Sequence, residues 1–136
     1  MILTIYTDGA SRGNPGLASY GFAISDGNGK LLYKEGKYIG TTTNNVAEYT
    51  AVLEAFKYIK KKFAHKEISR IELYADSKLV VEQLSGRFKI KSLLLKPIIE
   101  QIKILALELG GVTYNHIPRE QNTLADSLAN LALDSR

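Results

Sequence analysis

Cysteine is absent from the sequence, which excludes both a disulfide framework and a metal site built from thiolates. A metal site in this chain would have to use oxygen or imidazole ligands instead. A protein without disulfides fits the reducing environment of the cytoplasm, and we expect the chain to act there.

Long apolar runs are missing as well. The first residues, MILTIYTDGAS, lack the basic start and the apolar stretch of a secretory signal. No other stretch approaches the roughly 18 apolar residues that a membrane-spanning helix needs. We therefore expect no membrane partner.

Internal repeats, low-complexity tracts and recognisable linkers are also absent. The 136 residues suit one compact domain, and a hydrophobic share of 45% is enough to build a core. We expect residues 1–136 to form a single domain. The formal net charge of +4 is compatible with a polyanionic partner, but many proteins without such a partner carry the same charge.

The hydrophobic pattern predicts an α/β protein. Alternating apolar and polar residues predict strands over residues 1–8, 17–25, 30–39, 71–76 and 112–116. Helical spacing predicts a long helix from about 44–46 to about 60–62, and further helices over 77–84, 97–109 and 123–133. The first strand is expected to end at Asp8–Gly9, because Gly and Pro mark residues 10–16 as a loop.

Apolar rows mark one face of two of these helices. On the long helix, the row consists of Val52, Ala55, Phe56 and Ile59. On the last helix, it consists of Leu124, Leu128 and Leu131.

The connections between the predicted strands constrain the sheet. Two hairpins, one of them turning at residues 26–29, make the first three strands antiparallel, so the first and third run in the same direction. A helical crossover makes the fourth strand parallel to the third, and hence to the first. If the fourth strand pairs with the first, the ends of both strands lie side by side.

Four acidic residues then fall near one edge of the sheet. Asp8 and Asp76 end the first and fourth strands, Glu48 lies in the first turn of the long helix, and Asp126 lies in the last helix. Adjacent strands lie about 4.8 Å apart, close to the spacing of about 3.5–4 Å between paired catalytic metal ions. Clustered carboxylates repel one another, and a hard divalent cation relieves that repulsion. Oxygen ligands favour Mg²⁺ or Mn²⁺.

Each acid also has a purely structural interpretation. Asp8 before a glycine is typical of a turn, and Asp76 before Ser77 is typical of a helix cap. The spacing from Asn45 to Glu48 resembles a capping box, and Asp126 on its own is typical of a solvated helix residue. Only their joint placement favours a metal site.

The segments that carry these acids resemble the type 1 ribonuclease H family. The matching segments are TDGASRGNPG (7–16), TTTNNVAEYTAVLEA (41–55), LYADSKLVVEQL (73–84) and HIPREQNTLADSLANLA (116–132). The resemblance implies a mixed five-stranded sheet in the order 3-2-1-4-5, with the second strand antiparallel and helices on its faces. It also implies one catalytic domain without a separate hybrid-binding domain, and no obligate protein partner.

The resemblance further implies an activity, which is endonucleolytic cleavage of the RNA strand of an RNA/DNA hybrid. Asp8, Glu48, Asp76 and Asp126 would hold two Mg²⁺ ions, with Mn²⁺ as a possible substitute. One ion would activate the attacking water and the other would stabilise the leaving oxygen, giving 5′-phosphate and 3′-hydroxyl ends. His116 matches the family's mobile-loop histidine, which helps a proton to move or the product to leave. An ordinary exposed histidine is the alternative.

Polar residues near these acids correspond to the family's hybrid-binding surface. The resemblance assigns contacts with the minor groove and its 2′-hydroxyls to Ser11, Asn14, Thr43, Asn44 and Asn45. A turn, for Asn14, and helix capping, for residues 43–45, are the structural alternatives. Lys78 stands where the family often has glutamine, and we expect it to contact a phosphate.

The basic residues outside these motifs leave two interpretations open. The family's bacterial members often carry a long basic protrusion with tryptophans, where this chain has only SGRFKIKS (85–92), so we expect weaker phosphate contacts. A second basic run is a solvated helix end or a second nucleic-acid surface; it comprises Lys57, Lys60, Lys61, Lys62 and Lys66. His65 beside it is interpreted as an ordinary surface residue.

Two other functions stay open on the sequence alone. The chain could be a module that binds hybrids without cutting them, although all four acidic positions are intact. It could also be another nuclease of the wider superfamily, such as an exonuclease.

Overall fold

The computed structural model describes residues 1–64, 67–89 and 91–136, so the predictions for His65 and Lys66 lie outside the described residues. Its elements are β1 (Ile2–Gly13), β2 (Gly16–Asp26), β3 (Leu31–Thr42), α1 (Asn44–Lys62), β4 (Arg70–Ala75), α2 (Lys78–Leu84), α3 (Lys96–Glu108), β5 (Thr113–His116), the 3₁₀ turn η2 (Arg119–Gln121) and α4 (Thr123–Asp134). Within the described ranges, no helix is long and apolar enough to cross a membrane.

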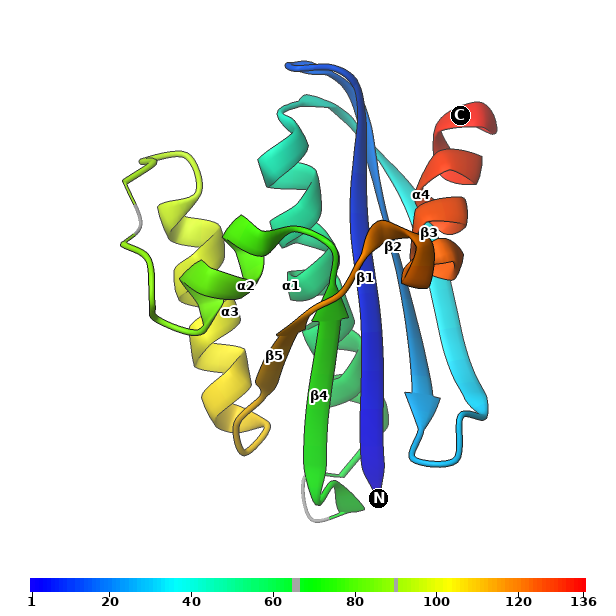
Figure 1. The fold of residues 1–136 in the computed structure, drawn as a ribbon, viewed down its shortest axis with the longest axis vertical. Helices are drawn as coiled ribbons and strands as arrows, with labels where there is room; N and C mark the ends of the chain where they lie inside the picture. Colours follow the sequence, from blue (N-terminus) through cyan, green and yellow to red (C-terminus); the bar gives the residue numbers. More distant parts are fainter. Residues whose placement is uncertain (65–66, 90) are drawn as a thin grey trace.

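The five strands form one mixed sheet in the order β3-β2-β1-β4-β5, which confirms the predicted order (Figure 1). β2 is antiparallel to β1 and β3, while β4 is parallel to β1 and β5 is parallel to β4. The pairing of β1 with β4 ends at Thr7 opposite Ala75. The residue that follows each of these two is an aspartate, so Asp8 and Asp76 lie side by side where β1 and β4 part.

The predicted end of the first strand at Asp8–Gly9 is wrong. β1 continues to Gly13 and pairs with β2 as far as Gly16, so most of the expected loop over residues 10–16 belongs to a long hairpin. Main-chain hydrogen bonds to β2 sustain this part of β1, although none of residues 9–13 is buried. Asp8 therefore lies inside a strand rather than in a turn.

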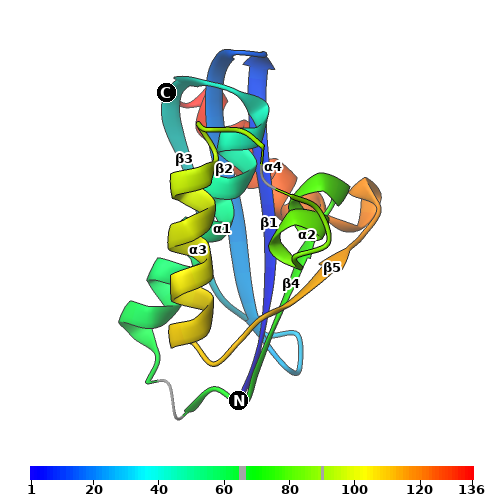
Figure 2. The same ribbon diagram turned by 90° about the vertical axis from the view of Figure 1, so that its left-hand side faces the viewer.

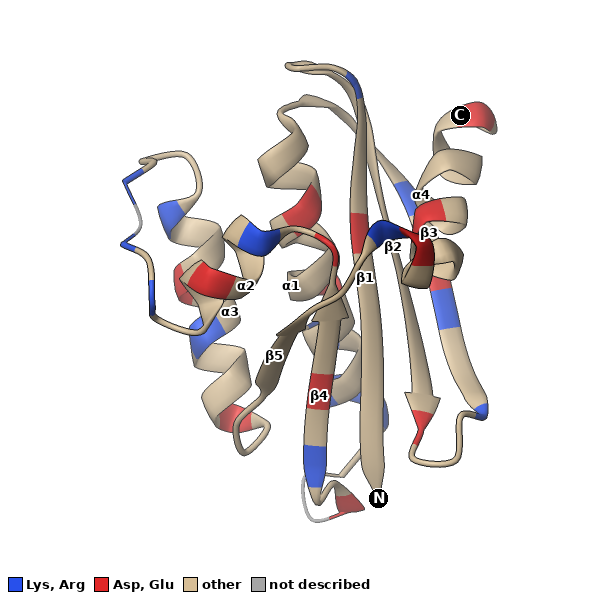
Figure 3. Cartoon of the chain, in the orientation of Figure 1, with Lys and Arg blue, Asp and Glu red and all other residues tan. Residues whose placement is uncertain are grey.

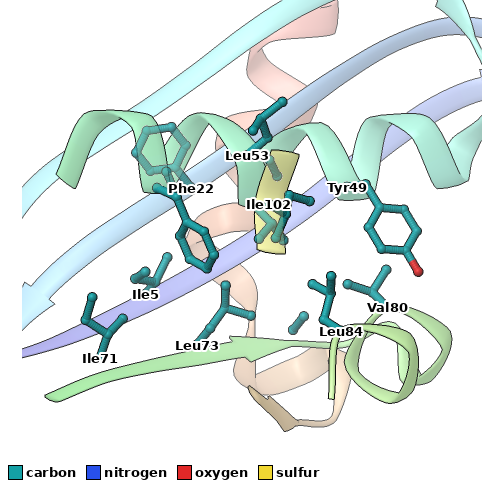
Figure 4. Packing of buried hydrophobic residues seen from close by; sticks show 14 of the residues in the cluster. Ile5, Phe22, Tyr49, Leu53, Ile71, Leu73, Val80, Leu84 and Ile102 are labelled. Atoms are coloured by element: carbon teal, nitrogen blue, oxygen red, sulfur yellow. The ribbon is translucent and has the colours of Figure 1, made fainter. Parts of the chain in front are cut away.

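Helices α1, α2 and α3 cover one face of the sheet and enclose the main core (Figure 2). The predicted apolar row of α1 is fully buried there, since Val52, Ala55, Phe56 and Ile59 have no exposed surface. Figure 4 shows residues of α1 packed against side chains from β1, β2 and β4, with α2 closing one end. This packing fixes α1, and with it Glu48, against the sheet.

Helix α4 packs on the opposite face, over β2 and β3, and two glycines allow its close approach. A Cβ atom on Gly21 would lie 2.4 Å from the carbonyl oxygen of Ala125, and one on Gly36 would lie 2.4 Å from that of Leu128. The buried residues of α4 are Ala125, Ala129 and Leu133. The leucine row expected on this helix points largely outward, because Leu124 and Leu131 are exposed. Two of the three buried residues are alanines, because the backbone of α4 lies in direct contact with the sheet at Gly21 and Gly36.

Gly21→Ala is expected to lower the free energy of unfolding by about 1–3 kcal/mol, because the backbone of α4 must move away from the sheet. Gly27→Ala is the matched control, since its Cβ would make an ordinary 3.4 Å contact with Ile2. Urea unfolding of the two variants and the wild type measures the difference. Equal stability of Gly21→Ala and the wild type would contradict this account of how α4 packs.

Candidate functional site

The four predicted carboxylates, which come from β1, α1, the residue after β4, and α4, line one open cleft of about 440 Å³. Acidic segments of β1, of α1 and of the turn after β4 gather beside the end of β4 (Figure 3). Elements far apart in the sequence thus bring Asp8, Glu48, Asp76 and Asp126 to the same place.

Asp8 and Asp76 form the centre of this cluster. Asp8 is 8% exposed, and one of its carboxylate oxygens accepts a hydrogen bond from the backbone amide of Gly9 at 3.0 Å. Asp76 directly follows the last residue of β4, and Ser77 then caps α2 by accepting from the amide of Val80. The cap of α2 is therefore Ser77, and the carboxylate of Asp76 is left for the cleft.

Glu48 reaches the cluster because the first turns of α1 lie against β1. A Cβ atom on Gly9 would lie 2.3 Å from the backbone nitrogen of Glu48, so only glycine permits this approach. The N-cap of α1 is Thr43, whose hydroxyl accepts from the amide of Val46 at 3.2 Å. The capping-box interpretation of Asn45 and Glu48 is therefore wrong, because the helix begins two residues too early for Glu48 to serve as the partner.

Asp126 lies in the first turn of α4, at the other side of the cleft. Its carboxylate accepts from the side-chain amide of Asn130 at 3.2 Å and lies 3.4 Å from the guanidinium of Arg119. It is also near enough to Asp8 for its negative charge to help raise the pKa of that carboxyl group. Asp126 therefore belongs to the same electrostatic cluster, although it already has a cationic partner.

The inner three carboxylates fit a hard divalent cation. One oxygen each from Asp8, Glu48 and Asp76 lies within 4.8 Å of the other two. Among the residues that the structure describes, no lysine or arginine forms an ion pair with any of these three. A half-buried group of carboxylates without a protein cation is the ligand set that Mg²⁺ and Mn²⁺ prefer.

Burial and mutual repulsion alter the titration of this cluster. Burial, followed by the negative charge of Asp76, raises the pKa of Asp8 from 3.8 to about 8. Burial also raises the pKa of Glu48 from 4.5 to about 7, against a hydrogen bond from Ser77 that lowers it. The metal-free site therefore holds protons near neutral pH, and a bound cation must displace them.

His116 is the last residue of β5, opposite Ala75, and so lies at a strand end rather than in a loop. Its side chain is exposed, and Nε2 lies 3.2 Å from the backbone oxygen of Asp76. The ring thus stands beside the acidic cluster without lining the cleft itself.

The predicted substrate-binding residues divide into two groups. Ser11, Asn14 and Asn44 line the cleft together with the carboxylates, and the side-chain oxygen of Asn14 accepts from the amide of Asn44 at 3.0 Å. This bond ties the tip of the β1–β2 hairpin to the start of α1. Asn45 instead lines a neighbouring groove beside α2, and Thr43 serves as the cap described above. Lys78 is exposed in the first turn of α2.

Two residues just before α4 also belong to the site, although the sequence did not single them out. Arg119 lines the cleft, and Asn122 is buried with its side-chain amide 3.4 Å from a carboxylate oxygen of Asp76. Both precede α4 in a segment that the sequence marks only as a loop. The only local signal in the sequence was that helical periodicity is absent before Asn122, a polar residue of the kind that caps a helix.

The predicted basic run on α1 is partly neutralised. Lys57 pairs with Glu54 at 3.2 Å, and Lys60 pairs with Glu108 of α3 at 2.9 Å. Lys60, Lys61 and Lys62 occupy the last turn of the helix, where positive charge is favourable. This placement favours the solvated helix end over a second nucleic-acid surface.

Comparisons with known proteins find similar sequences along nearly the whole chain. A family profile described as reverse transcriptase-like matches residues 6–132. A ribonuclease HI of Halobacterium salinarum is 39% identical over 133 residues, which cover 95% of this chain and 63% of that protein. A bifunctional protein of Mycobacterium tuberculosis is 40% identical over 99% of this chain. This chain spans 36% of the length of that mycobacterial relative.

Solved structures agree with this fold over the whole chain. The crystal structure of ribonuclease H1 from Halobacterium salinarum has a TM-score of 0.92 and 36% identity, and each chain is covered completely. The LC11 ribonuclease H1, crystallised with an RNA/DNA hybrid, has a TM-score of 0.90 and 39% identity, covering 98% of this chain and 97% of that one.

Replacement of Asp8 by asparagine is expected to raise the melting temperature of the metal-free protein. The amide has the same shape, and it avoids the free-energy cost at Asp8 of either holding a charge beside Asp76 and Glu48 or taking up a proton to remove that charge. A gain of about 1 kcal/mol in the free energy of unfolding would raise the midpoint by roughly 3–5 °C in a domain of this size. Calorimetry in chelator measures it, with the surface variant Asp134→Asn as a control that shows no gain. A midpoint at or below that of the wild type would refute the expectation.

The metal-free protein is also expected to lose stability as the pH rises. Folded Asp8 and Glu48 bind protons more tightly than the unfolded chain does, because their pKa values rise to about 8 and 7 from 3.8 and 4.5. The free energy of unfolding should therefore decline as the pH rises from about 4 to about 8, the range between the unfolded and folded pKa values of Asp8. The decline should be steeper in the wild type than in Asp8→Asn. Thermal melts in chelator from acidic to mildly alkaline pH measure the slopes. Identical slopes would count against the shift at Asp8.

Proposed function

Because this chain belongs to the type 1 ribonuclease H family, we propose that it cuts the RNA strand of RNA/DNA hybrids endonucleolytically. The products would carry 5′-phosphate and 3′-hydroxyl ends. The observation that carries this proposal is the convergence of Asp8, Glu48, Asp76 and Asp126 on one cleft. A family resemblance without that cluster would suit a binding module equally well.

The four carboxylates are assigned to hold two Mg²⁺ ions, with Mn²⁺ as a substitute. When bound, the two ions would supply an activated water and stabilise the charge on the leaving 3′ oxygen. Asp8 and Asp76 occupy the centre of the ligand set, since each directly follows the last residue that pairs β1 with β4. Glu48 and Asp126 extend it in opposite directions, toward α1 and α4. The open cleft leaves room for a phosphodiester beside them.

His116 is assigned to proton movement through its imidazole ring. The ring is exposed beside Asp76, where Nε2 donates to the backbone oxygen of Asp76 and Nδ1 is the nitrogen left to exchange a proton with water or with a leaving 3′ oxygen. An imidazole ring can both accept and donate a proton, which is the requirement for a general acid or base during turnover.

Recognition of the hybrid is assigned to the polar rim of the cleft. Ser11, Asn14 and Asn44 present hydroxyl and amide groups beside the carboxylates, and such groups pair with a 2′-hydroxyl that both donates and accepts. Thr43 fixes the start of α1 as its cap, so that Asn44 and Asn45 stand on a rigid turn. These contacts would distinguish RNA from DNA on the strand that is cut.

The second strand of the hybrid is assigned to the groove of about 580 Å³ beside α2. The groove combines apolar and basic residues, namely Leu79, Phe88, Leu95, Arg87, Lys89 and Lys91, with Asn45 at its edge. Phosphates contacted here, and by Lys78, would contribute sequence-independent affinity that weakens with salt. Arg87 already pairs with Glu82, which reduces the free positive charge.

That the protein acts in the cytoplasm stays a prediction.

A panel of labelled duplexes tests the proposal. With Mg²⁺ or Mn²⁺, the protein is expected to cut the RNA strand of an RNA/DNA hybrid and to leave the all-DNA and all-RNA duplexes largely intact. Chelator should abolish the cutting, and Asp76→Asn should reduce it at least a hundredfold, because one carboxylate of the cluster is lost. Asp134→Asn, on the far end of α4, is the matched control with full activity.

The other functions make different predictions in the same assay. A hybrid whose ends are blocked would resist an exonuclease but not an endonuclease. Binding of the hybrid without cleavage in either metal would contradict the proposal and favour the binding module.

A further inference from the structure

Asn122 stands at the N-cap position of α4, but its side chain does not cap the helix. Asparagine is favoured at this position because its side-chain oxygen can accept from an amide of the first turn. Here the side chain is buried, with 1% of its surface exposed, and turns toward the sheet instead. The side chain of Asn122 therefore does not have the capping role that is usual at this position.

The amide nitrogen of Asn122 spans the point where β1 and β4 part. It donates to the backbone oxygen of Thr7 at 2.8 Å and lies 3.4 Å from a carboxylate oxygen of Asp76. Thr7 is the last residue of β1 that pairs with β4, so one NH₂ group contacts both sides of the gap. The carbonyl of Thr7 can only accept, which fixes the nitrogen rather than the oxygen on this side.

The other polar atom of this side chain supports the same interpretation. The oxygen Oδ1 of Asn122 is buried and has no hydrogen-bond partner among the described residues. A buried oxygen without a partner is unfavourable, and such groups occur where another requirement sets the orientation of the side chain. In this site, the requirement is the pair of contacts made by the nitrogen.

We propose that Asn122 is a positioning residue, whose amide directs the carboxylate of Asp76 toward Asp8 and so arranges the acidic cluster for divalent cations. This inference rests on the proposed function. The hydrogen bond to Thr7 fixes the amide of Asn122 to β1, and the contact with Asp76 then holds the carboxylate in place relative to β1. Because Asn122 also begins α4, the same residue sets the position of the helix that carries Asp126.

The test compares Asn122→Ala with Asn115→Ala. The side chain of Asn115 also donates to a strand carbonyl, that of Leu73 at 3.3 Å, but it touches none of the four carboxylates. Both variants should melt below the wild type in chelator. Only Asn122→Ala should bind Mn²⁺ more weakly, by about tenfold or more, as expected when a group that orients a metal ligand is removed. Isothermal titration calorimetry without any hybrid measures this affinity.

A second readout separates positioning from a general loss of folded protein. In Asn122→Ala, the Mg²⁺ concentration for half-maximal cleavage should rise by a similar factor, while KM for the hybrid stays within about twofold. A smaller folded fraction alone would lower kcat and leave the metal dependence unchanged. Equal Mn²⁺ affinity in Asn122→Ala and Asn115→Ala would overturn the inference.

Should Asn122→Ala fail to fold, side-chain amide resonances in ¹⁵N-labelled protein carry the test. Asp76→Asn should shift the amide protons of Asn122 and leave those of Asn115 in place; no shift at Asn122 would overturn the inference. The proposed function fails separately. A wild type that binds Mn²⁺ but leaves hybrids uncut would refute the nuclease and leave the positioning role standing.

Discussion

The functional site depends on two aspartates that repel each other and that the pairing of β1 with β4 nevertheless holds side by side. Parallel pairing of β1 with β4 stops at Thr7 and Ala75, so Asp8 and Asp76 emerge as neighbours in a half-buried place. The surrounding elements maintain this unfavourable arrangement: Gly9 admits α1 with Glu48, and the glycines of β2 and β3 admit α4 with Asp126. Packing on both faces of the sheet thus stabilises a cluster that electrostatics alone would disperse.

This repulsion is also what gives the site its chemistry. In the part of the chain described, the inner three carboxylates form no ion pair with a lysine or arginine, and two of them have raised pKa values. Such a group provides a strong field for a small divalent cation. Neutralising the field would give a more stable protein without that capacity, as in other proteins where stability is sacrificed for function. The polar rim and the groove beside α2 then decide which polyanion is presented to the cluster.

Much of this could be predicted from the sequence, because hydrophobic periodicity marks the elements and their connections limit the topology. The alternation that defines β1 stops at Asp8, however, whereas its hydrogen bonds continue to Gly13, since β2 supplies partners regardless of side chain. The outward leucines of α4 were equally hidden, because glycines on two distant strands determine which face of the helix can pack. Asn122 could not be identified for a similar reason: its partners, Thr7 and Asp76, are distant in sequence.

The most direct test is a crystal structure of the protein grown with Mn²⁺ and recorded at a wavelength where manganese scatters anomalously. The account predicts anomalous density in contact with the carboxylates of Asp8 and Asp76, with Glu48 or Asp126 completing the ligands. Anomalous density only elsewhere on the molecule, with these carboxylates unbound at saturating Mn²⁺, would contradict it.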